Sequence, residues 1–166
     1  IILHDITAPV ASISPASSAL NCVTSSVTLT ASGGATYDWG GVITTAANTV
    51  SSANTYTVTV TGTNGCTATA ASAVVQDFTP PAAAITASTN ILTCTTLSIP
   101  LTATGGTGYD WGGGITTATN TVTAPNTYSV TVTAANGCTA VSSSTITQNV
   151  TAPVVSITPA NATLTC

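Results

Sequence analysis

An internal repeat with a period of 72 residues is the feature that most constrains the fold of this chain. Residues 7–78 align with residues 79–150 without a gap, and 39 of the 72 aligned positions are identical. The phrase YDWGG stands in both copies, and cysteines recur at the same two places in each. Because segments this similar build the same unit, the sequence predicts a tandem array of one small domain.

The two ends of the chain continue the same register. Residues 1–6 align with the end of a unit, and residues 151–166 align with the beginning of one. The expected organisation is the tail of a preceding repeat (1–6), two complete repeats (7–78 and 79–150) and the start of a further repeat (151–166). This register favours a chain cut from a longer array.

Within each unit, apolar and polar residues alternate with period two, as in Tyr56-Thr57-Val58-Thr59-Val60-Thr61. This alternation is typical of half-buried strands, and Asn-Gly pairs such as Asn64-Gly65 indicate hairpins. The expected fold is all-β, with tandem immunoglobulin-like β-sandwich domains of about 72 residues and seven strands each. The expected strands of the first unit start near Val10, Val27, Thr36, Val42, Asn48, Thr55 and Cys66.

Each complete unit contains two cysteines 44 positions apart. With the strand order above, Cys22 precedes the second strand and Cys66 follows the turn after the sixth, so both are expected at one end of the sandwich. The sequence thus predicts one intradomain disulfide per unit, Cys22 with Cys66 and Cys94 with Cys138. Free buried thiols and a metal site are the alternatives, although zinc sites use closely spaced cysteines and histidines. Disulfides favour a secreted, extracellular protein.

The chain is almost uncharged. It has no Lys or Arg, four acidic residues and one His, whereas ordinary domains carry about 25% charged residues. The sequence therefore offers no basic side chains that could bind the phosphates of a nucleic acid. No apolar run approaches the ~20 residues that a membrane-spanning helix needs. His4 is the single histidine, and the chain has no Lys or Glu, so it has almost no side chains that could serve in general acid–base catalysis. We therefore expect that the protein is not an enzyme and binds no cofactor.

Four local phrases recur in both units: a strand ending TLTASGG or PLTATGG, then TYDW or GYDW, then TYTVTV or TYSVTV, then NGCTA. This pattern resembles the tandem immunoglobulin-like or PKD-like repeats of very large secreted cell-surface adhesins of Bacteroidetes-type bacteria, and it covers the whole chain. The resemblance implies an exported β-sandwich protein that serves adhesion, motility or filament building without catalytic residues. The near absence of Lys, Arg and Glu departs from the usual composition of such repeats.

The YDWGG segments are the candidate ligand sites. Asp38 with Trp39, and Asp110 with Trp111, could present an aromatic face and an acidic acceptor to a glycan. The competing interpretation places both tryptophans in the core and uses each Asp to cap the following Gly turn.

Asp5, Asp77 and Asn149 occupy equivalent positions at the unit junctions. Calcium binding there would require about six to eight oxygen ligands, usually with several carboxylates. One Asp per junction is too few, so the sequence predicts no metal site.

The predicted function is a non-catalytic extracellular surface filament or adhesin stalk whose partners are copies of itself. One alternative is a carbohydrate-binding adhesion module that uses the YDWGG region. Another is an inert spacer that carries a terminal adhesive domain.

Overall fold

The computed structural model describes residues 5–152 and 154–155, and every described element is a β-strand. The first unit contains β1 (Ser12–Ser14), β2 (Ser17–Asn21), β3 (Val27–Ser32), β4 (Thr36–Asp38), β5 (Ala47–Val50), β6 (Asn54–Thr61) and β7 (Thr67–Asp77). The second unit contains β8 (Ala84–Ala87), β9 (Ile91–Thr93), β10 (Ile99–Thr104), β11 (Gly108–Asp110), β12 (Thr119–Val122), β13 (Asn126–Thr133) and β14 (Thr139–Asn149). The prediction of tandem all-β sandwiches is confirmed.

Each unit is a sandwich of a three-stranded and a four-stranded sheet. In the first unit the sheets have the strand orders β1-β3-β5 and β2-β7-β6-β4, and the second unit repeats them as β8-β10-β12 and β9-β14-β13-β11. Side chains of both sheets meet in the core, where Leu29 and Val50 pack with Leu20 and Val74. The Thr residues that alternate with these apolar positions face outward, which explains how so few charges keep the surface polar.

The chain changes sheets between β1 and β2. β1 pairs antiparallel with β3, whereas β2 pairs in parallel with β7 in the opposite sheet. The sequence prediction missed β2 because its inward positions include Ser18, so the apolar alternation is weak. The strand expected at Val42 is wrong: Gly40 and Gly41 have positive φ angles, and Val42 is 94% exposed in a loop that leaves the sandwich.

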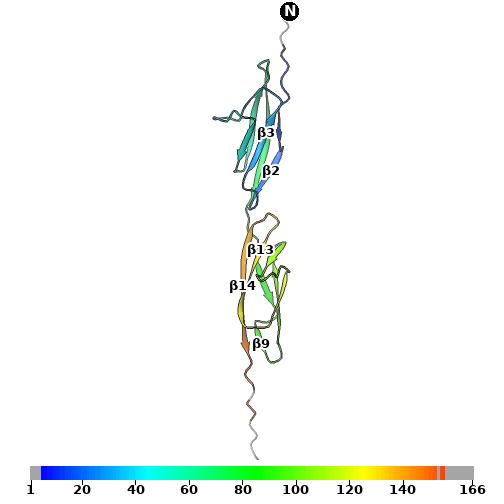
Figure 1. The fold of residues 1–166 in the computed structure, drawn as a ribbon, viewed down its shortest axis with the longest axis vertical. Helices are drawn as coiled ribbons and strands as arrows, with labels where there is room; N and C mark the ends of the chain where they lie inside the picture. The colour runs from blue at the N-terminus through cyan, green and yellow to red at the C-terminus, as the bar shows by residue number, and fades with distance from the viewer. Residues whose placement is uncertain (1–4, 153, 156–166) are drawn as a thin grey trace, which may run out of the picture.

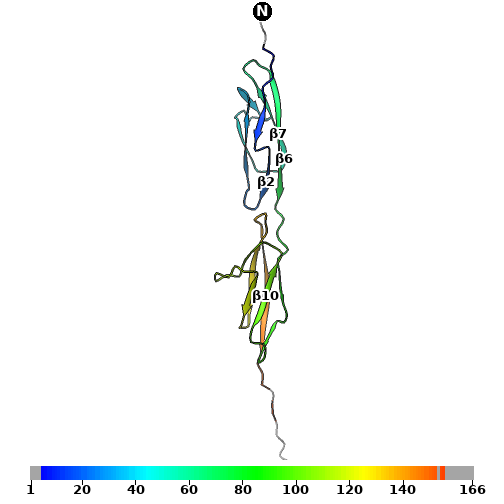
Figure 2. The same cartoon turned by 90° about the vertical axis from the view of Figure 1, so that its right-hand side faces the viewer.

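The two sandwiches are stacked end to end along the long axis of the molecule (Figures 1 and 2). β7 runs the full length of the first sandwich and leads directly through Phe78, Thr79, Pro80 and Pro81 into the second. We call the end of each sandwich that carries the β6–β7 or β13–β14 hairpin its upper end. The opposite end, where β2 or β9 finishes, is its lower end.

The two intradomain disulfides predicted from the sequence are wrong. The structure instead bonds Cys22 of the first unit to Cys138 of the second, while Cys66 and Cys94 are free. The parallel register is the reason, because Asn21 at the end of β2 lies beside Asp77 at the end of β7. Cys66 precedes the start of this 11-residue strand, so roughly 35 Å of strand separates it from Cys22, far beyond disulfide reach.

Candidate functional site

The junction between the two sandwiches is the candidate functional site, because it holds the disulfide. Cys22 lies in the loop after β2 at the lower end of the first sandwich. Cys138 lies in the β13–β14 hairpin at the upper end of the second. Their Cα atoms are 5.0 Å apart although 116 residues separate them in sequence. The chain therefore connects the two sandwiches twice, once by the linker and once by this bond.

Asn21 shapes the loop that carries Cys22. Its side-chain Oδ1 accepts hydrogen bonds from the backbone N–H groups of Val23 and Thr24, at 3.0 and 2.8 Å, and its own N–H donates to the Thr24 carbonyl at 2.9 Å. This turn satisfies the backbone groups at the end of β2 locally. It places Cys22 at the lower tip of the sandwich.

Asn136 fixes the hairpin that carries Cys138. Its Nδ2 donates to the carbonyl oxygens of Asp77 and Thr79, at 3.4 and 3.0 Å, and its Oδ1 accepts from the Cys138 N–H at 3.1 Å. One amide thus ties the hairpin to the linker that enters the same sandwich. This contact positions Cys138 relative to the end of β7.

The two loops are in close contact beside the disulfide. A Cβ built on Gly137 would overlap the Val23 side chain, so only glycine fits against Val23 here; Gly137 also has a φ of 76°. Cys138 is 2% exposed. Sequence reasoning identified Asn136-Gly137 as a hairpin but missed its role as a docking element.

The acidic residues at the unit junctions accept short-range backbone hydrogen bonds. Asp5 Oδ1 accepts from the Thr7 N–H at 2.9 Å, and Asp77 Oδ1 accepts from the Thr79 N–H at 3.0 Å. These bonds to the charged form lower the pKa of both carboxyl groups below the ordinary value. The negative charge of each group therefore supports the turn that leads into its sandwich.

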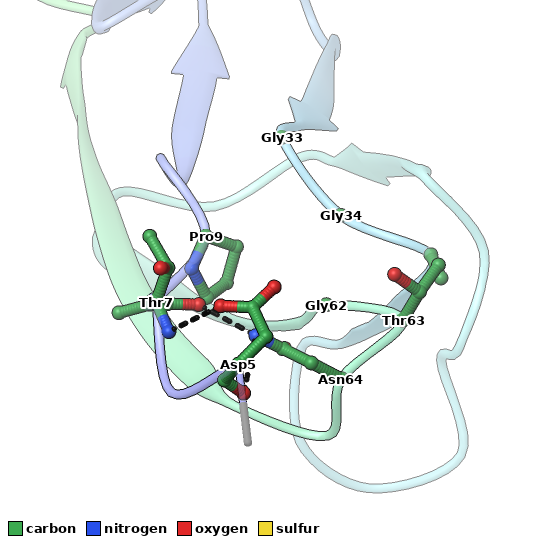
Figure 3. A pocket seen from close by; sticks show the side chains of 10 residues that line it. Asp5, Thr7, Pro9, Gly33, Gly34, Gly62, Thr63 and Asn64 are labelled. Atoms are coloured by element: carbon green, nitrogen blue, oxygen red, sulfur yellow. Dashed lines mark hydrogen bonds between the residues drawn. The ribbon is translucent and has the colours of Figure 1, made fainter. Parts of the chain in front are cut away.

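The upper end of the first sandwich carries a hollow of about 590 Å³, which is lined by segments that include Asp5, Pro9, Gly33 and Asn64. Figure 3 shows Asn64 directed at the backbone of Asp5 and Thr7, to which its Nδ2 donates at 3.2 and 2.9 Å. The contacts of Asn64 match those of Asn136 in the second unit.

The YDWGG segments begin in the short strands β4 and β11, which pair with β6 and β13, and they run into the loops that project from the sandwiches (Figures 1 and 2). Trp39 packs against the core clusters of the first unit, and its Nε1 donates to the Thr45 carbonyl at 2.9 Å; Trp111 has the equivalent contacts. Asp38 and Asp110 are exposed and accept from the N–H groups of Gly40 and Gly112, both at 2.8 Å. A glycan-binding role for these four residues stays a prediction.

The described residues contain no group of three or more His, Cys, Asp or Glu side chains that could hold a metal ion. In this part of the chain no helix is long and apolar enough to cross a membrane. His4 and Cys166 lie outside the described residues, as do most of the predicted terminal repeat fragments.

Comparison with known proteins leaves the family of the chain open. No family model matches the sequence, and no curated protein matches it. A solved structure from work on the host cell surface retention of a 1.5-MDa bacterial ice-binding adhesin aligns with 89% of this chain and 67% of its own, at 16% sequence identity and a TM-score of 0.49.

Proposed function

We propose that this chain is a non-catalytic structural protein of the cell exterior, whose disulfide-bonded sandwiches form a surface filament or an adhesin stalk. The observation that carries the proposal is the Cys22–Cys138 bond between successive units. A bond inside one domain would stabilise that domain alone. A bond between domains instead restricts their relative motion and joins them if either unfolds, which is useful in a protein under tension.

Two further features support this role. A disulfide persists in oxidising surroundings outside the cytosol. The near absence of charge keeps long-range repulsion between neighbouring rods small, so lateral association of copies costs little.

Force spectroscopy on single chains pulled from their termini tests the proposal. The bond places 116 residue steps outside the load path, and at about 3.5 Å per residue they represent roughly 400 Å of extension. We expect the oxidised chain to gain that much less length on full unfolding than the reduced chain. Equal extension with and without reductant would show that the bond carries no load, and the proposal would be abandoned.

The glycan-binding alternative has its own test. The exposed carboxylates Asp38 and Asp110 are the polar groups of the YDWGG segments that a sugar could reach. If a glycan array finds a ligand, the double substitution Asp38→Asn with Asp110→Asn should weaken its binding without unfolding the chain. An array without hits removes this alternative.

A further inference from the structure

The geometry that brings the first bonded cysteine to its partner recurs one unit later at Cys94. Asn21, directly before the bonded cysteine, lies beside Asp77 at the end of β7. Thr93, directly before Cys94, lies beside Asn149 at the end of β14 (Figure 1). In both units the thiol therefore stands at the lower end of the sandwich, where the chain leaves it.

The loop of Cys94 has the shape of the bonded loop. The Thr93 N–H donates to the Thr96 carbonyl at 3.0 Å, and Thr93 Oγ1 accepts from the N–H groups of Thr95 and Thr96, at 3.3 and 3.0 Å. Thr93 therefore replaces Asn21 with the same hydrogen-bond pattern. Cys94 is exposed at the tip of this turn.

The chain also leaves the second sandwich as it leaves the first. Asn149 Oδ1 accepts from the Thr151 N–H at 3.2 Å, and Asp77 Oδ1 accepts from the Thr79 N–H at 3.0 Å. Residues 151–166 then continue the repeat register with the sequence that begins a unit. A unit that follows the second one therefore starts with the same turn as the second unit does.

Each hairpin carries its own attachment to the linker that enters its unit. Asn136 Nδ2 donates to the carbonyls of Asp77 and Thr79, and Asn64 Nδ2 donates to the two equivalent carbonyls of the first unit, at 3.2 and 2.9 Å. In both units the N–H of the hairpin cysteine donates to Oδ1 of this asparagine at 3.1 Å. The contact that places the hairpin cysteine against the linker is thus a property of every unit.

We propose that Cys94 and the turn that carries it are the docking site for the β-hairpin of the next repeat in the same chain, sealed by a disulfide between Cys94 and the hairpin cysteine of that repeat. The occupant is a repeat of this chain because the Cys22–Cys138 junction already joins two such repeats through the same pair of elements. Cys66 is the hairpin cysteine that a preceding repeat would bond in the same way. The inference rests on the proposed filament function and names the contact that joins its units.

The bond forms by thiol–disulfide exchange with a small disulfide such as oxidised glutathione. The Cys94 thiolate attacks one sulfur of the small disulfide and releases one small thiol, which leaves a mixed disulfide on Cys94. The hairpin thiolate of the next repeat then attacks the Cys94 sulfur and releases the second small thiol. Two protein thiols are oxidised, and one small disulfide is reduced to two thiols.

The test extends the full chain to three complete units. A copy of residues 95–150 is added after Cys166, which finishes the unit that residues 151–166 begin. In the added copy, Ala135→Thr marks the hairpin peptide, and the first unit has Thr63 at this place. The extended chain is oxidised with glutathione at high dilution, and its monomeric fraction is alkylated and mapped without reduction. Chymotrypsin and pepsin are the proteases because the chain has no Lys or Arg.

Peptide mapping should find Cys94 bonded to the added hairpin cysteine, beside the Cys22–Cys138 bond. Cys66 and Cys166 should have no protein partner. Cys94→Ser in the extended chain is the control, and it should leave the added hairpin cysteine without a protein partner while Cys22–Cys138 stays intact.

A bond between the added hairpin cysteine and Cys166 would lie within one unit and would overturn the inference. Mapping that finds Cys94 without a protein partner, or bonded to Cys66, would overturn it too. None of these outcomes alters the Cys22–Cys138 bond of the original chain, so the force experiment remains a separate test of the proposed function.

Discussion

At the scale of single residues, Asp77 joins β7 to the linker by accepting the Thr79 N–H. Because this hydrogen bond lowers the pKa of Asp77 in the folded state, its stabilisation is present above the ordinary pKa and is lost as pH falls through the folded value. Asn149 accepts the Thr151 N–H in the same way at 3.2 Å. We therefore expect Asp77→Asn to keep the melting temperature at pH 7 and to reduce its fall in acid.

Asp77→Ala is the comparison, since it removes the acceptor as well as the charge. We expect this variant to melt at a lower temperature than the parent at pH 7. Thermal unfolding from pH 7 down to pH 2 checks both variants. If Asp77→Asn keeps the full acid sensitivity of the parent, the carboxylate of Asp77 plays no part in it.

Glycine at position 105 is required by the backbone. Gly105 has a φ of 104°, and a Cβ there would overlap the Ala82 carbonyl. Because both the dihedral and the contact oppose a side chain, Gly105→Ala should cost at least about 2 kcal/mol of unfolding free energy. Gly108→Ala is the control: its Cβ would lie 3.4 Å from Thr133, and the first unit has Thr36 at this place. Urea denaturation measures both, and equal midpoints would contradict the argument.

At the scale of strands, β2 connects the core of the first unit to the disulfide. Leu20 of β2 is fully buried, and Leu20→Ala should cost about 2–5 kcal/mol. The damage should be confined to the first unit, because each core is built from the residues of one unit. The indole N–H signals of Trp39 and Trp111 report the two units separately in NMR melting experiments.

The Trp39 signal of Leu20→Ala should therefore disappear at a lower temperature than the Trp111 signal. Leu92→Ala, the equivalent change in the second unit, should reverse this order. Val42→Ala, at an exposed position, should change the unfolding free energy of neither unit by more than about 0.5 kcal/mol. Simultaneous loss of both signals in Leu20→Ala would show that the two units unfold as one.

Strand β2 also explains what the sequence could and could not predict. Period-two alternation identified β3 and β6 because one face of each carries mainly Val, Leu, Ala or Tyr and the other mainly Thr. β2 has too few apolar residues to produce that signal. Without β2, the direction of the chain at Cys22 was unknown, so the sequence could not tell at which end of the sandwich this thiol lies.

At the scale of the whole molecule, the sequence predicted the tandem sandwiches but not the way in which they are joined. The strands of the repeat and the Asn-Gly turns are determined by residues that are close together in the sequence, so a sequence pattern can indicate them. The disulfide depends on contacts between residues 116 positions apart. A period of 72 makes Cys66 and Cys138 equivalent but leaves their partners open, because bonds within a unit and bonds between units fit the same spacing.

An inter-unit bond should control the shape of the molecule more than the stability of its parts. We expect Cys138→Ser to keep the strand signal in circular dichroism, since both cores stay complete. Its small-angle scattering should indicate a broader range of end-to-end lengths, because Phe78, Thr79 and the two prolines then connect the sandwiches without the second link. Cys66→Ser is the control, because it removes a thiol outside the bonded junction. Under mild reduction that breaks intermolecular disulfides but keeps the Cys22–Cys138 bond, it should scatter like the parent. If Cys138→Ser gives the scattering curve of the parent, the linker and the Asn136 contacts alone hold the two sandwiches in line.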